Sequence, residues 1–272
     1  MKENIKASNT DSFDHSTHQE FVEYYANESL SDSTINRMQG IINCVLRNIE
    51  SSRLNQKLDI ADIGCGTGIM SVMWARQGHT VYGLDVNEAL LEIAGQRAME
   101  EGLAIEFSLG SATQLPWADQ SMDVCIAPEL LEHVVEWEAC LKEFVRILKP
   151  NGILFISTAN KLCPIQQEFN LPFYSWYPSY IKHYCEELAR TTHPQLAGYA
   201  KYPAVNWFSF YQLRKEFSKL GMKAFDRFDI MDIDNKSDFK KAAIKIVRNS
   251  SLLRLFGHIC TSGLPVLAIK NK

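Results

Sequence analysis

The segment Asp62–Ser71, DIGCGTGIMS, places three glycines at alternating positions, 64, 66 and 68, directly after a short apolar run. Residues 58–64 predict a buried strand, and residues 68–78 have the apolar spacing of a helix that a glycine ends. A glycine turn between a strand and a helix leaves backbone amides and a helix N-terminus open to a ligand. The segment therefore predicts a binding turn in an α/β protein.

The rest of the chain repeats this alternation of strand and helix. Strands are predicted at residues 79–85, 104–110, 122–128 and 152–158, with helices after Asn87 and over residues 136–150. Later segments predict a helix at 209–221, a strand at 222–230, helical residues near 237–256 and a strand at 264–270. Alternating strands and helices form βαβ units, so a parallel sheet covered by helices on both faces is expected.

The composition argues against several classes of protein. The 272 residues carry a net charge of −4 without a long basic run, which disfavours a nucleic-acid-binding surface. Seven scattered cysteines without a CxxC pair favour free thiols in a reducing cytosol over disulfides or a zinc site. Residues 1–20 lack the apolar core of a signal peptide, and no apolar run approaches the roughly 18 residues of a membrane span. We therefore expect a cytoplasmic protein.

The chain is predicted to form one domain with additions rather than two domains. Residues 1–57, which contain apolar residues at helical spacing, are interpreted as an N-terminal helical cap. Residues 58–272 are interpreted as the α/β domain. Within it, residues 161–208 show no clear period and are interpreted as an insertion.

Three details of the glycine turn favour one ligand. Its spacing is GxGxG, whereas nicotinamide dinucleotide sites carry GxGxxG. Asp62 precedes the first glycine by two residues, and Asp85 ends the second strand, where an acid meets ribose hydroxyls in nucleotide-binding units. A ribose joined to a small charged group fits S-adenosylmethionine better than NAD. An NAD-dependent oxidoreductase is the disfavoured alternative.

Four motifs carry a resemblance to a known family: DIGCGTG, LDVNEALLEIA, GSATQLPWADQSMDVCIAPELLEHV and LKPNGILFIST. In order and spacing they resemble the motifs of class I S-adenosylmethionine-dependent methyltransferases, over residues 58–160. The resemblance implies a doubly wound, Rossmann-like seven-stranded sheet whose last strand, residues 264–270, is antiparallel and lies beside strand six. PELLEHV and STANK are most similar to the small-molecule O-methyltransferases of ubiquinone biosynthesis.

The resemblance also implies a set of cofactor-binding residues. Asp62 and the first glycines of the turn would hold the methionyl part, Asp85 the ribose and Val86 the adenine. Ser111 stands where many relatives have an aspartate, and its hydroxyl could accept the same bond. For Arg37, a solvated helix arginine is the equal alternative. The full set implied is Arg37, Asp62, Gly64, Cys65, Gly66, Gly68, Asp85, Val86, Ser111, Ala112, Ala127 and Pro128.

The catalytic candidates follow the fourth predicted strand in ELLEHV, where ligands bind in open α/β sheets. A hydroxyl nucleophile benefits from a base, so Glu129 and His133 are predicted to act in catalysis. A divalent metal held by Glu129, Glu132 and His133 is a less favoured alternative, because neither His183 nor His193 stands in a motif that completes such a site. A purely structural start of a helix is the third interpretation.

The insertion is predicted to select the methyl acceptor. Residues 169–211 hold 13 of the chain's 29 aromatic residues, and their prolines interrupt regular helix. Aromatic walls suit an apolar or ring-bearing small molecule, although packing of the rings onto the sheet is an equal alternative. Peripheral contact with a membrane surface stays open, and Leu252, Leu253, Leu255 and Phe256 form a second apolar patch.

We therefore predict an S-adenosylmethionine-dependent methyltransferase that acts on a small-molecule acceptor, with O-methylation favoured. An N- or C-methyltransferase of a natural product and a non-catalytic S-adenosylmethionine-binding protein are the alternatives. The sequence does not determine the acceptor or the oligomeric state.

Overall fold

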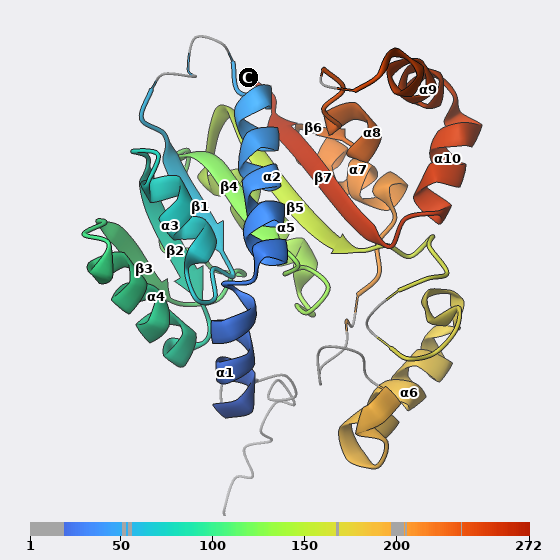
Figure 1. Ribbon diagram of the computed structural model, residues 1–272, viewed down its shortest axis with the longest axis horizontal. Helices are drawn as coiled ribbons and strands as arrows, with labels where there is room; N and C mark the ends of the chain where they lie inside the picture. Colours follow the sequence, from blue (N-terminus) through green and yellow to red (C-terminus); the bar gives the residue numbers. More distant parts are fainter. Residues whose placement is uncertain are drawn as a thin grey trace, which may run out of the picture.

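The computed structural model describes residues 19–50, 53, 56–166, 169–196, 204, 206–234 and 236–272. The predictions for residues 1–18 and for residues 197–203 of the insertion lie outside the described residues. The centre of the described part is a seven-stranded sheet (Figure 1). Its strands are β1 (Asp59–Ile63), β2 (Thr80–Asp85), β3 (Ile105–Leu109), β4 (Met122–Pro128), β5 (Leu148–Ala159), β6 (Met222–Phe225) and β7 (Gly263–Lys270).

The sheet has the order β3-β2-β1-β4-β5-β7-β6. Strands β1 to β5 pair in parallel, whereas β7 runs antiparallel to both of its neighbours, β5 and β6. The predicted α/β fold, with an antiparallel last strand beside strand six, is confirmed. Because the parallel strands end at one edge of the sheet, the turns that follow β1, β2 and β4 lie at that edge.

Helices cover both faces of the sheet (Figure 1). Buried side chains of α5 and α7 pack against one face, and those of α2 and α3 pack against the other. The longer helices are α1 (Gln19–Glu28), α2 (Asp32–Asn48), α3 (Ile69–Ala75), α4 (Glu88–Glu100), α5 (Trp137–Ile147), α6 (Ser179–Thr191), α7 (Phe210–Lys219), α9 (Asp238–Asn249) and α10 (Ser251–Ile259). All seven cysteines are free thiols, as expected. None of the helices described is long and apolar enough to cross a bilayer.

Two segments differ from their predicted secondary structure. The strand predicted over residues 222–230 ends at Phe225, and a short helix, α8 (Arg227–Ile230), follows it. Asp226 causes the change, because its carboxylate accepts the backbone N–H groups of Phe228 and Asp229 and caps the helix. Residues 129–134 form a turn rather than the start of a helix, and α5 begins only at Trp137.

Helix α6 lies in the segment for which the sequence shows no period. It buries Lys182 and Glu186 together with apolar residues of the same face, and it exposes Tyr180 and Tyr184. The buried Lys182 ammonium donates to the Ser175 carbonyl oxygen at 2.9 Å. Charged residues lie among the apolar ones on the packed face of this helix and tyrosines lie on the exposed face, so the sequence shows no clear apolar period.

Candidate functional site

The glycine turn between β1 and α3 has the backbone conformation that its glycines allow. Gly64, Gly66 and Gly68 have φ values of 72°, 52° and 74°, which L-residues with side chains rarely adopt. A Cβ added at Gly68 would lie 2.7 Å from the Ala94 Cβ of α4, so this glycine is needed for packing. At Gly66 the nearest atom would be a Leu90 methyl at 4.0 Å, so this part of the turn borders open space.

Asp85 lies at the end of β2 and is bonded to the glycine turn. Its carboxylate accepts the Gly66 backbone N–H at 2.8 Å and the Asn87 backbone N–H at 2.9 Å. Burial raises the pKa of this carboxyl group, and the two backbone bonds oppose that rise. The next residue, Val86, is 70 % exposed although it is apolar. An acid and an exposed apolar side chain therefore lie together beside the open part of the turn.

Asp62 lies under the turn rather than at its surface. It is 1 % exposed, and its carboxylate accepts the Ser71 hydroxyl at 2.6 Å. Burial raises the Asp62 pKa to about 6, and the nearby Asp85 carboxylate adds to the rise. Any contact between Asp62 and a ligand would therefore run through the glycine turn, as the resemblance implies.

The raised Asp62 pKa predicts a pH-dependent stability. A carboxyl group with a higher pKa in the folded state stabilises the fold below its unfolded pKa, near 4, and this contribution is lost as the pH rises through about 6. In Asp62→Asn the loss cannot occur. From pH 4 to pH 7 the unfolding free energy of this variant should therefore rise relative to wild type by on the order of 2–3 kcal/mol. Denaturant titrations at several pH values measure this, with the exposed Glu106→Gln as the control. A constant difference would contradict the prediction.

Arg97 of α4 fixes the position of the turn and was not found by sequence reasoning. Its guanidinium donates to the Thr67 carbonyl and hydroxyl oxygens at 3.0 and 2.7 Å. It also donates to the Ala26 carbonyl of α1 at 3.0 Å. No motif signals this role, because Arg97 lies 30 residues from Thr67 and only the fold brings α1, α4 and the turn together.

Other residues of the implied cofactor set lie around the same edge. Cys65, Ala112 and Ala127 are buried, and Pro128 is partly exposed. Burial raises the pKa of the Cys65 thiol strongly, so this cysteine is not a nucleophile. Ser111 is exposed, and its hydroxyl lies 2.8 Å from that of Thr113.

Arg37 and Glu129 come from separate parts of the sequence and form an ion pair. The Arg37 Nη1 atom of α2 donates to the Glu129 carboxylate at 2.5 Å, and both side chains are about half exposed. Glu129 follows β4 with a φ of 54°, a conformation that costs a residue with a side chain about 1–2 kcal/mol. Its backbone N–H donates to the Ser157 carbonyl of β5 at 2.7 Å, which holds this strained residue at the edge of the sheet.

The remaining catalytic candidate, His133, lies in the turn after β4. Burial lowers its pKa to about 4, so the imidazole is neutral at pH 7. Glu132, beside it, is 3 % exposed, and its carbonyl oxygen accepts the Asn206 backbone N–H at 3.0 Å. Within the described ranges, no three His, Cys, Asp or Glu side chains are placed to hold a metal ion.

The site has the features expected of a methyltransferase: a parallel sheet, a glycine turn bordered by open space and an acid at the end of β2. The family described as "Methyltransferase domain" matches residues 61–156, which run from β1 to β5. The chain belongs to the S-adenosylmethionine-dependent methyltransferases. The residues around the turn fit the cofactor of this family, because Gly66 and Val86 leave room beside the Asp85 carboxylate.

Two curated relatives carry the name ubiquinone biosynthesis O-methyltransferase. The protein from Pasteurella multocida is 32 % identical over 191 residues, which cover 61 % of this chain and 77 % of the relative. The protein from Agrobacterium fabrum is 35 % identical over 115 residues, covering 42 % of this chain and 46 % of the relative. The chain thus spans about half the length of several relatives that it matches.

Solved structures share the fold at low sequence identity. The YcgJ protein from Bacillus subtilis has a TM-score of 0.55 and 17 % identity, with 87 % of this chain and 99 % of that chain covered. The [4+2]-cyclase SpnF has a TM-score of 0.52 and 18 % identity, with 85 % and 80 % covered. A protein described as a cyclase has this fold, so the fold alone does not specify the reaction.

Proposed function

We propose that this protein transfers the methyl group of S-adenosylmethionine to a hydroxyl group of an apolar or ring-bearing small molecule. The observation that carries the proposal is the Asp85 carboxylate bonded to the Gly66 amide beside the exposed Val86. This arrangement offers an acceptor for ribose hydroxyls and an apolar surface for a base. The name of the two relatives supports methylation at oxygen.

The cofactor supplies a methyl group already activated on a sulfonium, so the protein has mainly to align the acceptor and exclude water. Asp85 binds the ribose, and Asp62 supports the turn from below. Arg37 would bind the carboxylate of the cofactor in place of its Glu129 partner. Glu129 and His133 would face the acceptor hydroxyl, and the neutral imidazole would accept the hydroxyl proton as the methyl group leaves the sulfonium.

The insertion holds the acceptor in this proposal. Many of its rings pack on one another around the stacked pair Phe169 and Tyr174, whose ring centroids are 4.1 Å apart. A second stacked pair, Phe173 and Trp176, has centroids 6.0 Å apart and is more than half exposed. Helix α6 and its neighbouring loops lie beyond the edge of the sheet where the parallel strands end (Figure 1). We place the acceptor against this exposed pair, which offers an apolar wall.

The first consequence concerns Asp85. In Asp85→Ala the Gly66 and Asn87 amides lose their acceptor and the ribose loses its partner. Cofactor affinity should fall about 10- to 150-fold, the loss of one charge-assisted hydrogen bond. Calorimetric titration measures this, and Glu106→Ala, an exposed acid on the neighbouring strand, should bind normally. Unchanged affinity in a folded Asp85→Ala protein would remove this residue from the site.

A second consequence concerns the exposed rings. The double variant Phe173→Ala/Trp176→Ala should raise the acceptor KM at least tenfold, because the apolar wall is removed. The cofactor affinity should stay within twofold of wild type. Met99→Ala, an equally exposed apolar residue of α4, is the matched control. An unchanged KM would show that these rings do not contact the acceptor.

The proposal itself is tested by product analysis. Methyl-labelled S-adenosylmethionine is incubated with the protein and a panel of ring-bearing phenols, amines and apolar compounds, and labelled products are identified. Label on a hydroxyl oxygen supports the proposal. Label on nitrogen or carbon would favour an N- or C-methyltransferase. Cofactor binding without any transfer would favour a non-catalytic protein.

A further inference from the structure

Helix α10 packs with its charged face toward the protein. Arg254 donates to the carboxylates of Asp226 and Asp229 at 2.9 and 2.5 Å, and His258 lies 3.2 Å from Asp226. Asp226 is 0 % exposed and His258 is 1 % exposed. This network fixes the rotation of the helix, because turning it would remove Arg254 and His258 from the two aspartates.

The opposite face of α10 is apolar and exposed. Leu252 is 77 % exposed and Phe256 is 65 % exposed, with Leu253 and Leu255 exposed beside them. Residues 252, 255 and 256 are spaced by three and four positions, so they lie on one side of the helix. The apolar side of α10 therefore faces away from the core. In soluble domains, amphipathic helices usually turn their apolar side toward the core.

Helix α9 continues this surface. Phe239 is 83 % exposed and Ile246 is 61 % exposed, and Ala242 and Ala243 lie between them on the same side. The inner side is fixed by Arg248, which donates to carbonyl oxygens of residues 228, 229 and 231. Both helices therefore expose an apolar stripe, and the inward-facing arginines, held by their hydrogen bonds, prevent either helix from turning this stripe inward.

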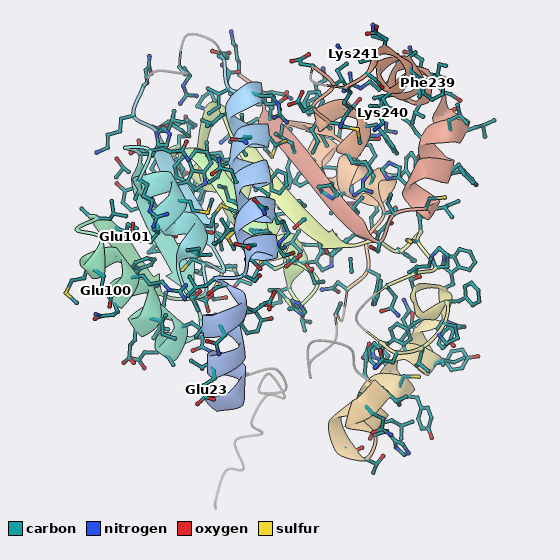
Figure 2. All side chains as sticks on the ribbon, viewed as in Figure 1. Glu23, Glu100, Glu101, Phe239, Lys240 and Lys241 are labelled. Carbon is teal, nitrogen blue, oxygen red and sulfur yellow. The ribbon has the colours of Figure 1, made fainter. Side chains whose placement is uncertain are left out.

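The charge around this surface differs from that of the whole protein. Apart from the two inward-facing arginines, residues 236–260 hold four lysines against one aspartate, a formal charge of +3, whereas the chain as a whole has −4. In the described part of the chain, no acidic side chain pairs with the four lysines at 236, 240, 241 and 245. Figure 2 shows Phe239, Lys240 and Lys241 together on α9, far from Glu100 and Glu101 at the C-terminal end of α4.

We infer that α9 and α10 bind the surface of an anionic lipid bilayer. Exposed aromatic and leucine side chains enter the boundary between head groups and acyl chains, and lysines beside them attract anionic head groups. The positive charge of this surface selects an anionic bilayer over a second copy of the chain, because two copies of the same basic surface repel. The inference concerns a surface apart from the glycine turn and does not depend on the proposed function.

The test is co-sedimentation of the full chain with vesicles of phosphatidylcholine alone or with about a third phosphatidylglycerol. We expect binding to the anionic vesicles that weakens with added salt, and little binding to the neutral ones. Phe239→Ser/Phe256→Ser and Lys240→Glu/Lys241→Glu should each lower the partition coefficient at least tenfold. Met99→Ser, an exposed apolar change beside Glu100, should not.

Thermal unfolding of each variant verifies that the fold is kept. We expect it to be kept, because the changed side chains lie at the surface and not in the core. Equal binding by all variants would overturn the inference, as would failure of the wild type to bind anionic vesicles. The inference would also be overturned if the wild type associated with itself in the absence of lipid and the Phe239→Ser/Phe256→Ser change abolished this association. The surface would then join two copies of the chain.

Discussion

A Gly66→Val variant should lose at least a hundredfold in affinity for S-adenosylmethionine and still fold. The structure leaves about 4 Å of clearance at this position, so the new side chain meets no protein atom at its Cβ. It enters instead the space beside Asp85 that the cofactor needs. The left-handed backbone at Gly66 costs a branched residue about 1–2 kcal/mol, which the fold should survive.

The matched comparison is Gly68→Ala, two residues along the same turn. Here even a methyl group would lie 2.7 Å from Ala94, so overpacking adds to the backbone strain. The variant should lose about 2–4 kcal/mol of stability. Calorimetric titration and denaturant unfolding of both variants separate the two effects. Normal cofactor affinity in folded Gly66→Val would show that the open part of the turn is not the binding site.

The second large effect is expected from His133→Ala, which should lower turnover by roughly 10²- to 10⁴-fold. The loss should appear in kcat with little change in cofactor affinity. His133 lies on the turn after β4, whereas Asp85, to which we assign the ribose, ends β2. Because burial lowers the His133 pKa to about 4, the acidic limb of the wild-type pH–rate profile should lie near pH 4 rather than near 6.5. That limb should be absent from the variant.

Two further outcomes would change the interpretation of His133. A variant with a lower melting temperature and turnover within a few-fold of wild type would show a structural role. Loss of wild-type activity on addition of a chelator, with recovery in a divalent metal, would favour the metal site instead. We expect no chelator effect, because within the part of the chain that the structure describes the acids and histidines do not converge on one point.

Local patterns predicted the parallel α/β sheet, and the resemblance to methyltransferases supplied the antiparallel last strand. Short apolar runs and the glycine turn predicted β1 to β5, since a strand buried on both faces, such as β4, is apolar along most of its length. Asn87 was identified as a helix cap from its own side chain, which accepts the Leu90 N–H in the structure. Such signals depend on neighbouring residues, so they can be seen without the tertiary structure.

The sequence also named Arg37 and Glu129 separately, but not their contact. The two lie 92 residues apart, and the ion pair exists because α2 packs over the end of β4. The lowered His133 pKa likewise comes from burial, which depends on the atoms that surround the ring. The roles of these residues stay predictions until the variants are measured.

By itself, the sequence determined the order of β1 to β5, the glycine turn and the two acids beside it, because their signals lie within a few residues. Only the tertiary structure decided which face of a helix is buried. In α6 and α10, Lys182 and Arg254 turn inward, while Tyr180 and Phe256 are exposed. The partners of the two cations, Ser175 and Asp226, lie outside the helices, so hydrophobic periodicity within each helix could not predict these inward positions.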